Sequence, residues 1–378
     1  MNWFRDTWAR LSPRGRQGTI GGAVVVVVIA VIGTAVGLSG SGAHTVATTT
    51  TAPPTTTSTT TTAPPIITTT TEPKQGPVAP LTGLHLADPL LAFRPALAVK
   101  IDNLDTPGES AVPQTGLNLA DIVFEEVVEG NITRLVGIFQ SQNVGRVGPV
   151  RSARTTDVHL LPQFGRPMLA WSGGNGGVVA AVRSSPWIYD FGYDRQTSAY
   201  ARDHSRAAPH NLYLQADQLF ARAPAGDGPP PPLFVYRQPN QPMNGGATKA
   251  SGVDLNFGGG MSAPVTWRWN GLLGVYLRSQ RGRPHLDSSG AQLSATNVVL
   301  LITDYGQSPA DSRSPEAHTV GSGEAFVYTN GFVVHGTWFR PDESKPGILL
   351  DEAGKPILLK PGPTWVELPR AGNAVTVL

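Results

Sequence analysis

The first clear feature of the hydrophobic pattern is an uncharged run from Ile20 to Leu38. At 1.5 Å per residue, a helix of this length would cross roughly 28 Å, close to the thickness of a bilayer core. Arginines precede the run, and a positive flank stays in the cytoplasm. We therefore predict a cytoplasmic tail at residues 1–19 and a signal anchor at residues 20–38. The alternative is a signal peptide, cleaved near the small residues 41–43.

Residues 39–80 form the second region, and their composition offers almost nothing to bury. Sixteen threonines and two Pro-Pro pairs lie between Thr45 and Pro80. Such a segment favours extended conformations, and at about 3.1 Å per residue its 36 residues could reach on the order of 110 Å. We predict a disordered stalk that holds a folded region away from the membrane.

A folded α/β domain is predicted over residues 81–222. Apolar runs at residues 96–102, 121–128 and 132–141 have strand character, and a short loop at 129–131 suggests a hairpin between the last two. These runs are apolar on both faces, as in the covered centre of a sheet. Helices are expected at residues 155–161 and 212–221.

Four prolines end a clear break at residues 223–232, and the pattern then becomes β-rich up to residue 378. Asn270-Gly271 and Asn330-Gly331 each lie between strand-like runs, and Asn-Gly is the strongest short hairpin signal. Residues 233–378 therefore predict a second, mostly antiparallel domain. The expected fold class is α+β, with a mixed sheet and helices in the first domain. Trp267 and Trp269 share a strand face, as core residues or as a platform for stacking sugars.

Composition narrows the class of protein. The chain has no cysteine, which excludes disulfides, thiolate metal sites and a cysteine-linked lipid. The net charge of +2 comes from the N-terminal tail, because residues 81–378 hold 24 basic and 25 acidic residues. We expect no nucleic-acid partner on this balance. No histidine pair has metal-ligand spacing, and no cofactor motif is present, so we predict neither a metal nor a cofactor.

Several blocks of sequence resemble one known family. The blocks RPALAVKIDN (94–103), PQTGLNLADIVFEEVVEGNITRLVGIFQSQ (113–142), VGPVRSAR (147–154) and RAAPHNLY (206–213) are similar to the YerB-like family of bacterial envelope proteins. Later stretches, ATNVVLLIT (295–303), GEAFVYTNG (323–331) and PGPTWVELP (361–369), resemble its second domain. The resemblance implies an extracytoplasmic α+β protein of two domains, with no established biochemical role. Its members are often lipoproteins anchored through a cysteine; here a transmembrane helix would replace that anchor.

The sharpest local feature is the segment 148–156, which joins a predicted strand to a predicted helix. Arg151 and Arg154 lie three residues apart at the expected helix start, and Ser152 or Thr155 could cap it. Two guanidinium forks beside a helix N-terminus predict an anion site. The alternative is structural, with the arginines paired to Glu126 and Glu129.

Carboxylates and a histidine form further candidates. Glu125, Glu126 and Glu129 lie on one predicted strand, opposite Arg134 on its hairpin partner. Glu125 and Glu129 should share a face. Paired carboxylates can perform acid–base chemistry at a glycosidic bond, although a salt-bridge network is the alternative. His210 could be a ligand, a base or an ordinary loop residue, with Asn211 as a helix cap.

Two functions follow as hypotheses. The first is a non-enzymatic, membrane-anchored envelope protein that binds an anionic cell-wall component or a partner protein. Its site residues would be Asp102, Asn103, Arg134, Arg151, Ser152, Arg154 and Asn211. The second is a cell-wall hydrolase or transferase with Glu126 as general acid or base, assisted by His210. It requires these two groups to converge in one cleft.

Overall fold

The computed structural model describes residues 76–378, except 259 and 374. The predicted tail, the membrane anchor and nearly all of the predicted stalk lie outside these residues. Within the described part of the chain, no helix is long and apolar enough to cross a membrane.

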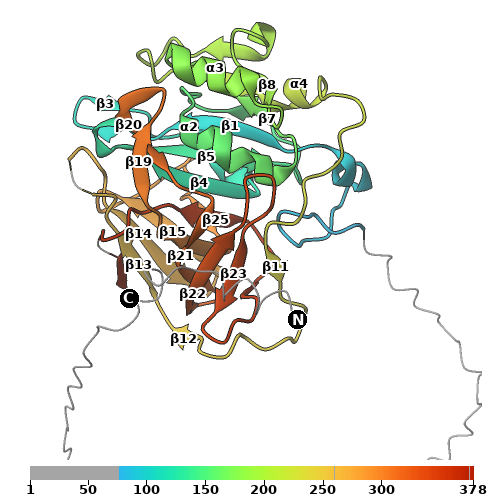
Figure 1. The fold of residues 1–378 in the computed structure, drawn as a ribbon, viewed down its shortest axis with the longest axis vertical. Coiled ribbons are helices and arrows are strands. Elements are labelled where there is room, and N and C mark those ends of the chain that lie inside the picture. The colour runs from blue at the N-terminus through green and yellow to red at the C-terminus, as the bar shows by residue number, and fades with distance from the viewer. Residues whose placement is uncertain (1–75, 259, 374) are drawn as a thin grey trace, which may run out of the picture. The chain divides into compact units, whose positions relative to one another are not determined.

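One large mixed sheet organises the described residues (Figure 1). Its strands run in the order β12-β22-β21-β18-β25-β4-β5-β1-β7-β8, with β23 paired to β22. Their bounds are β1 Leu97–Asp102, β4 Ile122–Val127, β5 Thr133–Phe139, β7 Met168–Ala170, β8 Tyr189–Asp190, β12 Thr248–Lys249, β18 Asn297–Leu301, β21 Gly321–Thr329, β22 Phe332–Arg340, β23 Ile348–Asp351 and β25 Thr364–Glu367. The predicted hairpin of residues 121–141 is confirmed as β4 and β5, fully buried on both faces.

The sheet passes from one half of the sequence to the other without a break. β25, near the C-terminus, pairs in parallel with both β18 and β4. The Pro-rich segment 223–232 therefore separates the halves along the chain, while their backbones share one hydrogen-bonded ladder. The described residues belong to one compact unit.

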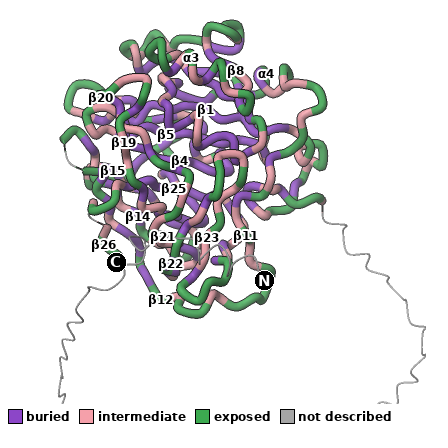
Figure 2. The backbone as a smooth tube through the Cα atoms, viewed as in Figure 1, coloured by how far each residue is buried: buried purple, intermediate pink, exposed green. Residues whose placement is uncertain are grey.

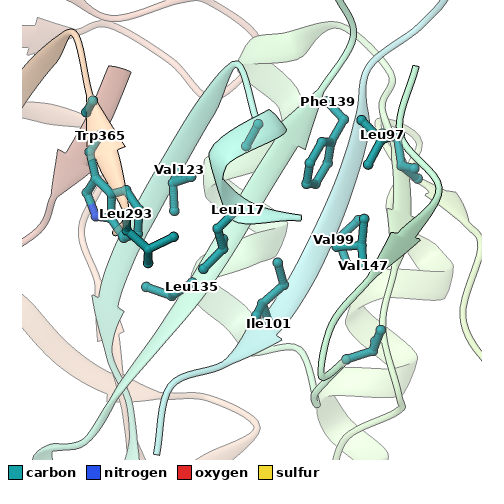
Figure 3. Close-up of a cluster of buried hydrophobic side chains, with 14 of the residues drawn as sticks. Leu97, Val99, Ile101, Leu117, Val123, Leu135, Phe139, Val147, Leu293 and Trp365 are labelled. Carbon is teal, nitrogen blue, oxygen red and sulfur yellow. The ribbon is translucent and has the colours of Figure 1, made fainter. Parts of the chain in front are cut away.

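A second, antiparallel sheet covers one face of the large sheet. Its order is β16-β15-β14-β13-β26, with β17 paired to β15. The bounds are β13 Gly252–Leu255, β14 Val265–Asn270, β15 Val275–Gln280, β16 Arg283–Pro284, β17 Ser294–Ala295 and β26 Val375–Val377. Between the sheets lies a core in which Val123, Leu135 and Ile101 from neighbouring strands point the same way (Figure 3). Trp267 is fully buried in this core, and Trp269 packs against it half-buried.

Short helices cover the opposite face of the large sheet, where a second buried core forms (Figure 2). Phe124 and Val136 from the sheet meet Leu160 and Val178 from the helices there. The helices are α2 Thr155–Leu160, α3 Gly176–Ser184 and α4 Ala216–Phe220, of which α4 packs on the first core instead. Short 3₁₀ turns lie at Pro89–Phe93, Leu117–Leu119, Glu129–Asn131, Leu161–Phe164 and Thr197–Ala199.

The remaining strands form small sheets. They are β2 Asp105–Thr106 with β3 Glu109–Ser110, β6 Arg146–Val147 with β10 Leu212–Gln215 and β9 Tyr200–Arg202, β11 Val235–Tyr236 with β24 Leu358–Leu359, and β19 Tyr305–Ser308 with β20 Asp311–Ala317. The prediction of one helix over 212–221 is wrong in its first half. Leu212 to Leu214 are all buried between β6 and β9, so pairing on both sides makes this stretch a strand.

Both Asn-Gly pairs lie at hairpins, as predicted. Asn330 and Gly331 have φ angles of 53° and 79° and form a two-residue turn between β21 and β22. Positive φ at both positions is the geometry that matches the twist of a hairpin. Asn270 begins a longer loop between β14 and β15, and its side chain accepts bonds from the Leu272 and Leu273 amides.

Candidate functional site

Three arginines gather at one end of the central strands of the large sheet, next to α2. Arg134 lies at the start of β5, opposite Asp102 on β1, and the chain before α2 supplies Arg151 and Arg154. Arg134 donates to the backbone carbonyl of Ser152 at 3.0 Å, which ties the β5 strand to the arginine loop. Arg154 pairs with Glu129 at 2.5 Å, and Arg134 lies 3.9 Å from the same carboxylate.

Arg151 differs from its two neighbours in exposure. Its Nε lies 2.8 Å from the buried Asp102 carboxylate, and its side chain is 25% exposed. The side chains of Arg134 and Arg154 are only 6% and 11% exposed. Within residues 76–378, no partner is assigned to the terminal guanidinium nitrogens of Arg151. It is therefore the member of the cluster that can meet a ligand.

Asp102 also binds His210, which lies between two carboxylates. His210 Nδ1 lies 2.7 Å from Asp102, and Nε2 lies 2.7 Å from Glu109 of β3. Donation to both carboxylates at once requires a proton on each ring nitrogen, as in the imidazolium form. The hydrogen bond with Asp102 raises the pKa of His210, against the effect of its burial. His210 thus ties the β2–β3 hairpin to the end of β1.

Burial and neighbouring charges shift the pKa values of the groups around the arginines. Burial, and then the charges of Arg154 and Arg151, lower the pKa of Arg134 to about 10. Burial opposes ionisation of Glu129, yet hydrogen bonds from Arg154 and Ser314 lower its pKa to about 2. The carboxylates Asp102, Glu129 and Asp311 interact with these guanidinium groups.

The helix after this loop does not contribute as the sequence suggested. α2 has only six residues, and its N-cap is Arg154 instead of Ser152 or Thr155. The Arg154 backbone amide donates to the Asp157 side chain at 2.7 Å. Arg151 lies before the helix in extended chain, where its amide donates to Lys100 on β1. Any anion site here rests on the guanidinium groups, not on the helix end.

Glu126 lies in the interior, and its described ion pair is with a lysine, not with an arginine. It is fully inaccessible and pairs with Lys100, which also contacts Asp157 at 2.9 Å. Burial raises the pKa of Glu126 to about 7. The alternative prediction, in which the arginines pair with Glu126 and Glu129, is therefore confirmed for Glu129 and wrong for Glu126. Glu126 pairs with Lys100, whereas His210 pairs with Asp102 and Glu109. Glu126 and His210 therefore share no contact among the described residues.

Glu125 points to the opposite face of the sheet from Glu126. It pairs with the buried Arg278 of β15 at 2.6 Å. The prediction that Glu125 and Glu129 share a face is wrong, because the strand ends at Val127 and a 3₁₀ turn re-aims Glu129. Burial, and then the charge of Glu125, raise the pKa of the neighbouring Glu367 well above its ordinary value.

Asn103 and Asn211 are both buried in structural roles. Asn103 donates to Thr133, Glu125 and Gln280 and accepts from Gln114. Asn211 caps no helix, because β10 follows it; its side chain accepts from Arg202 at 2.7 Å and donates to the Arg206 carbonyl.

Comparison with known proteins supports the resemblance seen in the sequence. Residues 81–227 match the "Protein of unknown function (DUF3048) N-terminal domain", and residues 253–366 match the corresponding C-terminal domain. The chain belongs to this YerB-like family. It is 28% identical over 297 residues to the Bacillus subtilis (strain 168) protein named "Putative lipoprotein YerB", covering 77% of this chain and 85% of that one. The crystal structure of Bacillus subtilis YerB has a TM-score of 0.66 at 24% identity and covers 79% of this chain and 99% of the crystallised one.

The DUF3048 N-terminal region contains the whole arginine cluster, and it also contains three residues that the sequence did not single out. These are Glu109, Lys100 and Asp157, which complete the ion pairs of His210 and Glu126. Lys100 carried a signal, since a charged residue in the middle of an otherwise apolar strand must find a partner when it is buried. Glu109 and Asp157 had no such signal.

Proposed function

We propose that this YerB-like protein is a membrane-attached envelope protein that binds an anionic ligand through Arg151, supported by Arg134 and Arg154. The observation that carries the proposal is that Arg151 is both ion-paired and partly exposed. Its Nε forms an ion pair with buried Asp102, while a quarter of its side chain is exposed. A fixed, planar fork is suited to phosphate or carboxylate groups.

The envelope location draws support from two sources. The Bacillus subtilis relative is named as a lipoprotein, a class of protein held at a membrane. This chain has no cysteine to carry such a lipid, and its apolar run at residues 20–38 is the segment that would attach it instead. The Thr- and Pro-rich stalk would then carry the arginine cluster outward, toward the anionic polymers of a cell wall.

The test is a thermal-shift titration of the full-length protein in detergent. The probes are inorganic phosphate, pyrophosphate and phosphate-containing wall fragments. A probe at 100 times its dissociation constant stabilises the protein by about 2.7 kcal/mol, a rise on the order of 5 °C. We expect Arg151→Gln to abolish this rise and Arg195→Gln, an exposed arginine elsewhere, to keep it. An equal rise in both variants, or no rise with any probe, would refute an anion site at Arg151.

A further inference from the structure

A lysine and two carboxylic acids lie together in the apolar interior, with no access to solvent. Lys100, Glu126 and Asp157 are each 0% exposed. Val136 lies directly across from Lys100 on the neighbouring strand, and Phe124 lies two residues before Glu126 on the same face. Charged groups in such surroundings are costly unless they are neutralised. The anion-binding function proposed above does not use these three residues.

From this arrangement we propose that Lys100 and Asp157 become joined by an intramolecular isopeptide bond, with Glu126 as the catalytic proton carrier. Lys100 Nζ contacts both carboxyl groups at once, Asp157 Oδ1 at 2.9 Å and Glu126 Oε1 in a short hydrogen bond. A C–O bond of about 1.2 Å places Asp157 Cγ within about 4 Å of the lysine nitrogen, near the attack distance of about 3–3.5 Å.

Glu126 is suited to moving the proton. Its pKa is raised to about 7 by burial, so the group can exist in either protonation state near neutrality. Its second oxygen, Oε2, is buried without a hydrogen-bond partner among the described residues. A neutral carboxyl group tolerates such an environment better than a carboxylate does.

Asp157 is held as the electrophile. The backbone amide of Arg154 donates to Asp157 Oδ2 at 2.7 Å, while Oδ1 faces the lysine. Negative charge that develops on Oδ2 during attack is stabilised by this amide donor. Oδ1 is then the oxygen that leaves.

The reaction balances without any added reagent. The Lys100 ammonium gives a proton to Glu126, and the free amine attacks Asp157 Cγ to form the new C–N bond. The Cγ–Oδ1 bond breaks as Oδ1 leaves with two of the three ammonium protons, delivered through Glu126, as water. Glu126 returns to its starting state, and one proton remains on the amide nitrogen. Exclusion of water from the core disfavours the reverse hydrolysis.

Mass spectrometry of the full-length protein tests the proposal directly. We expect a tryptic digest to contain a branched peptide that joins Lys100 to Asp157 and is lighter by one water than its two parts. Loss of water alone is not sufficient, because the Asp227-Gly228 sequence can form a cyclic imide with the same mass change. Fragmentation of the branched peptide separates the two products.

Glu126→Gln and Lys100→Met should each give the linear peptides only, and Lys249→Met, a change at an exposed lysine, should keep the branch. Linear Lys100 and Asp157 peptides from the folded, unmutated protein would overturn the proposal even if the variants fail to fold. A branch from Lys100 to Glu126 would also overturn it, since the roles of the two acids would be exchanged.

Discussion

Arg278 is the residue whose removal should disturb the interior most. It is fully buried between the two large sheets, and its guanidinium group binds Glu125 at 2.6 Å and Gln280 at 2.8 Å, with a short contact to His285. Its charge also lies 5.1 Å from the ring centre of Trp365. The change Arg278→Met keeps much of the volume and removes the charge that compensates Glu125.

Breaking a buried ion pair from one side costs about 3–5 kcal/mol, because the remaining charge stays in a medium that cannot solvate it. Glu125 accepts further bonds from Thr133 and Asn103, which favours the lower end of this range. The nearby Glu367 favours the higher end if it loses its proton, because burial and Glu125 already raise its pKa well above the ordinary value. We expect a loss of about 4 kcal/mol near neutral pH.

The assay is equilibrium unfolding in urea at about pH 7.5 and about pH 5. In the unmutated protein the charge of Arg278 lowers the pKa of Glu367 against the effect of burial, so in the variant the pKa of Glu367 rises further in the folded state. A raised pKa gives stability that is present below the unfolded value, about 4.3 for Glu, and that is lost as the pH rises. The deficit of Arg278→Met relative to the unmutated protein should therefore shrink at the lower pH.

Two further variants make the experiment decisive. Glu125→Gln combined with Arg278→Met removes both charges and should recover much of the loss. Arg268→Met removes an exposed arginine that pairs with an exposed Asp254, and it should cost less than about 1 kcal/mol. A loss under about 1 kcal/mol for Arg278→Met, or a double variant no better than the single one, would refute the account.

Two other changes test separate parts of the structure. His210→Gln should remove a pH dependence of the free energy of unfolding. Because the pKa of His210 is raised in the folded state, its contribution to stability is full below about pH 6.5 and is lost as the pH rises through the folded value. In urea unfolding, the unmutated protein and the variant should therefore differ less at high pH. Gly331→Ala should cost about 1–2 kcal/mol from its positive φ, and more because its Cβ would lie 2.8 Å from the Trp269 ring. Gly354 also has a positive φ, but a Cβ there would meet no atom within 4 Å. Equal losses of stability in Gly331→Ala and Gly354→Ala would therefore refute the predicted effect of the contact with Trp269.

Local patterns predicted much of the fold. The β4–β5 hairpin and the Asn330-Gly331 turn join residues close in sequence, and their signals lie in the residues themselves. The parallel pairing of β25 with β4 joins distant segments, and nothing in either strand's sequence specifies the other. The helix expected at residues 212–221 failed for a related reason, since its first half became a strand through pairing with β6 and β9.

The arginine site was predictable in its members but not in its partners. Arg134, Arg151 and Arg154 do lie together, as the charge pattern suggested. Which acid each would bind depended on the face to which each carboxylate points. Glu126 lies opposite Arg134 in register, yet the buried amine of Lys100 binds it instead. Asp157 lies in the first turn of the short helix α2, and nothing in the sequence indicated that it would also contact the Lys100 amine.

The pairing of β25 with β4 decides when the protein can become native. A chain leaves the ribosome from its N-terminus at about 5–20 residues per second, so Thr364 follows Val127 by roughly 12–47 s. During that interval the edge of β4, a buried strand that carries Glu125 and Glu126 among apolar residues, has no strand beside it. Unpaired edges of this kind recruit other chains. The first half of the chain therefore needs protection from other chains until Thr364–Glu367 pairs with β4.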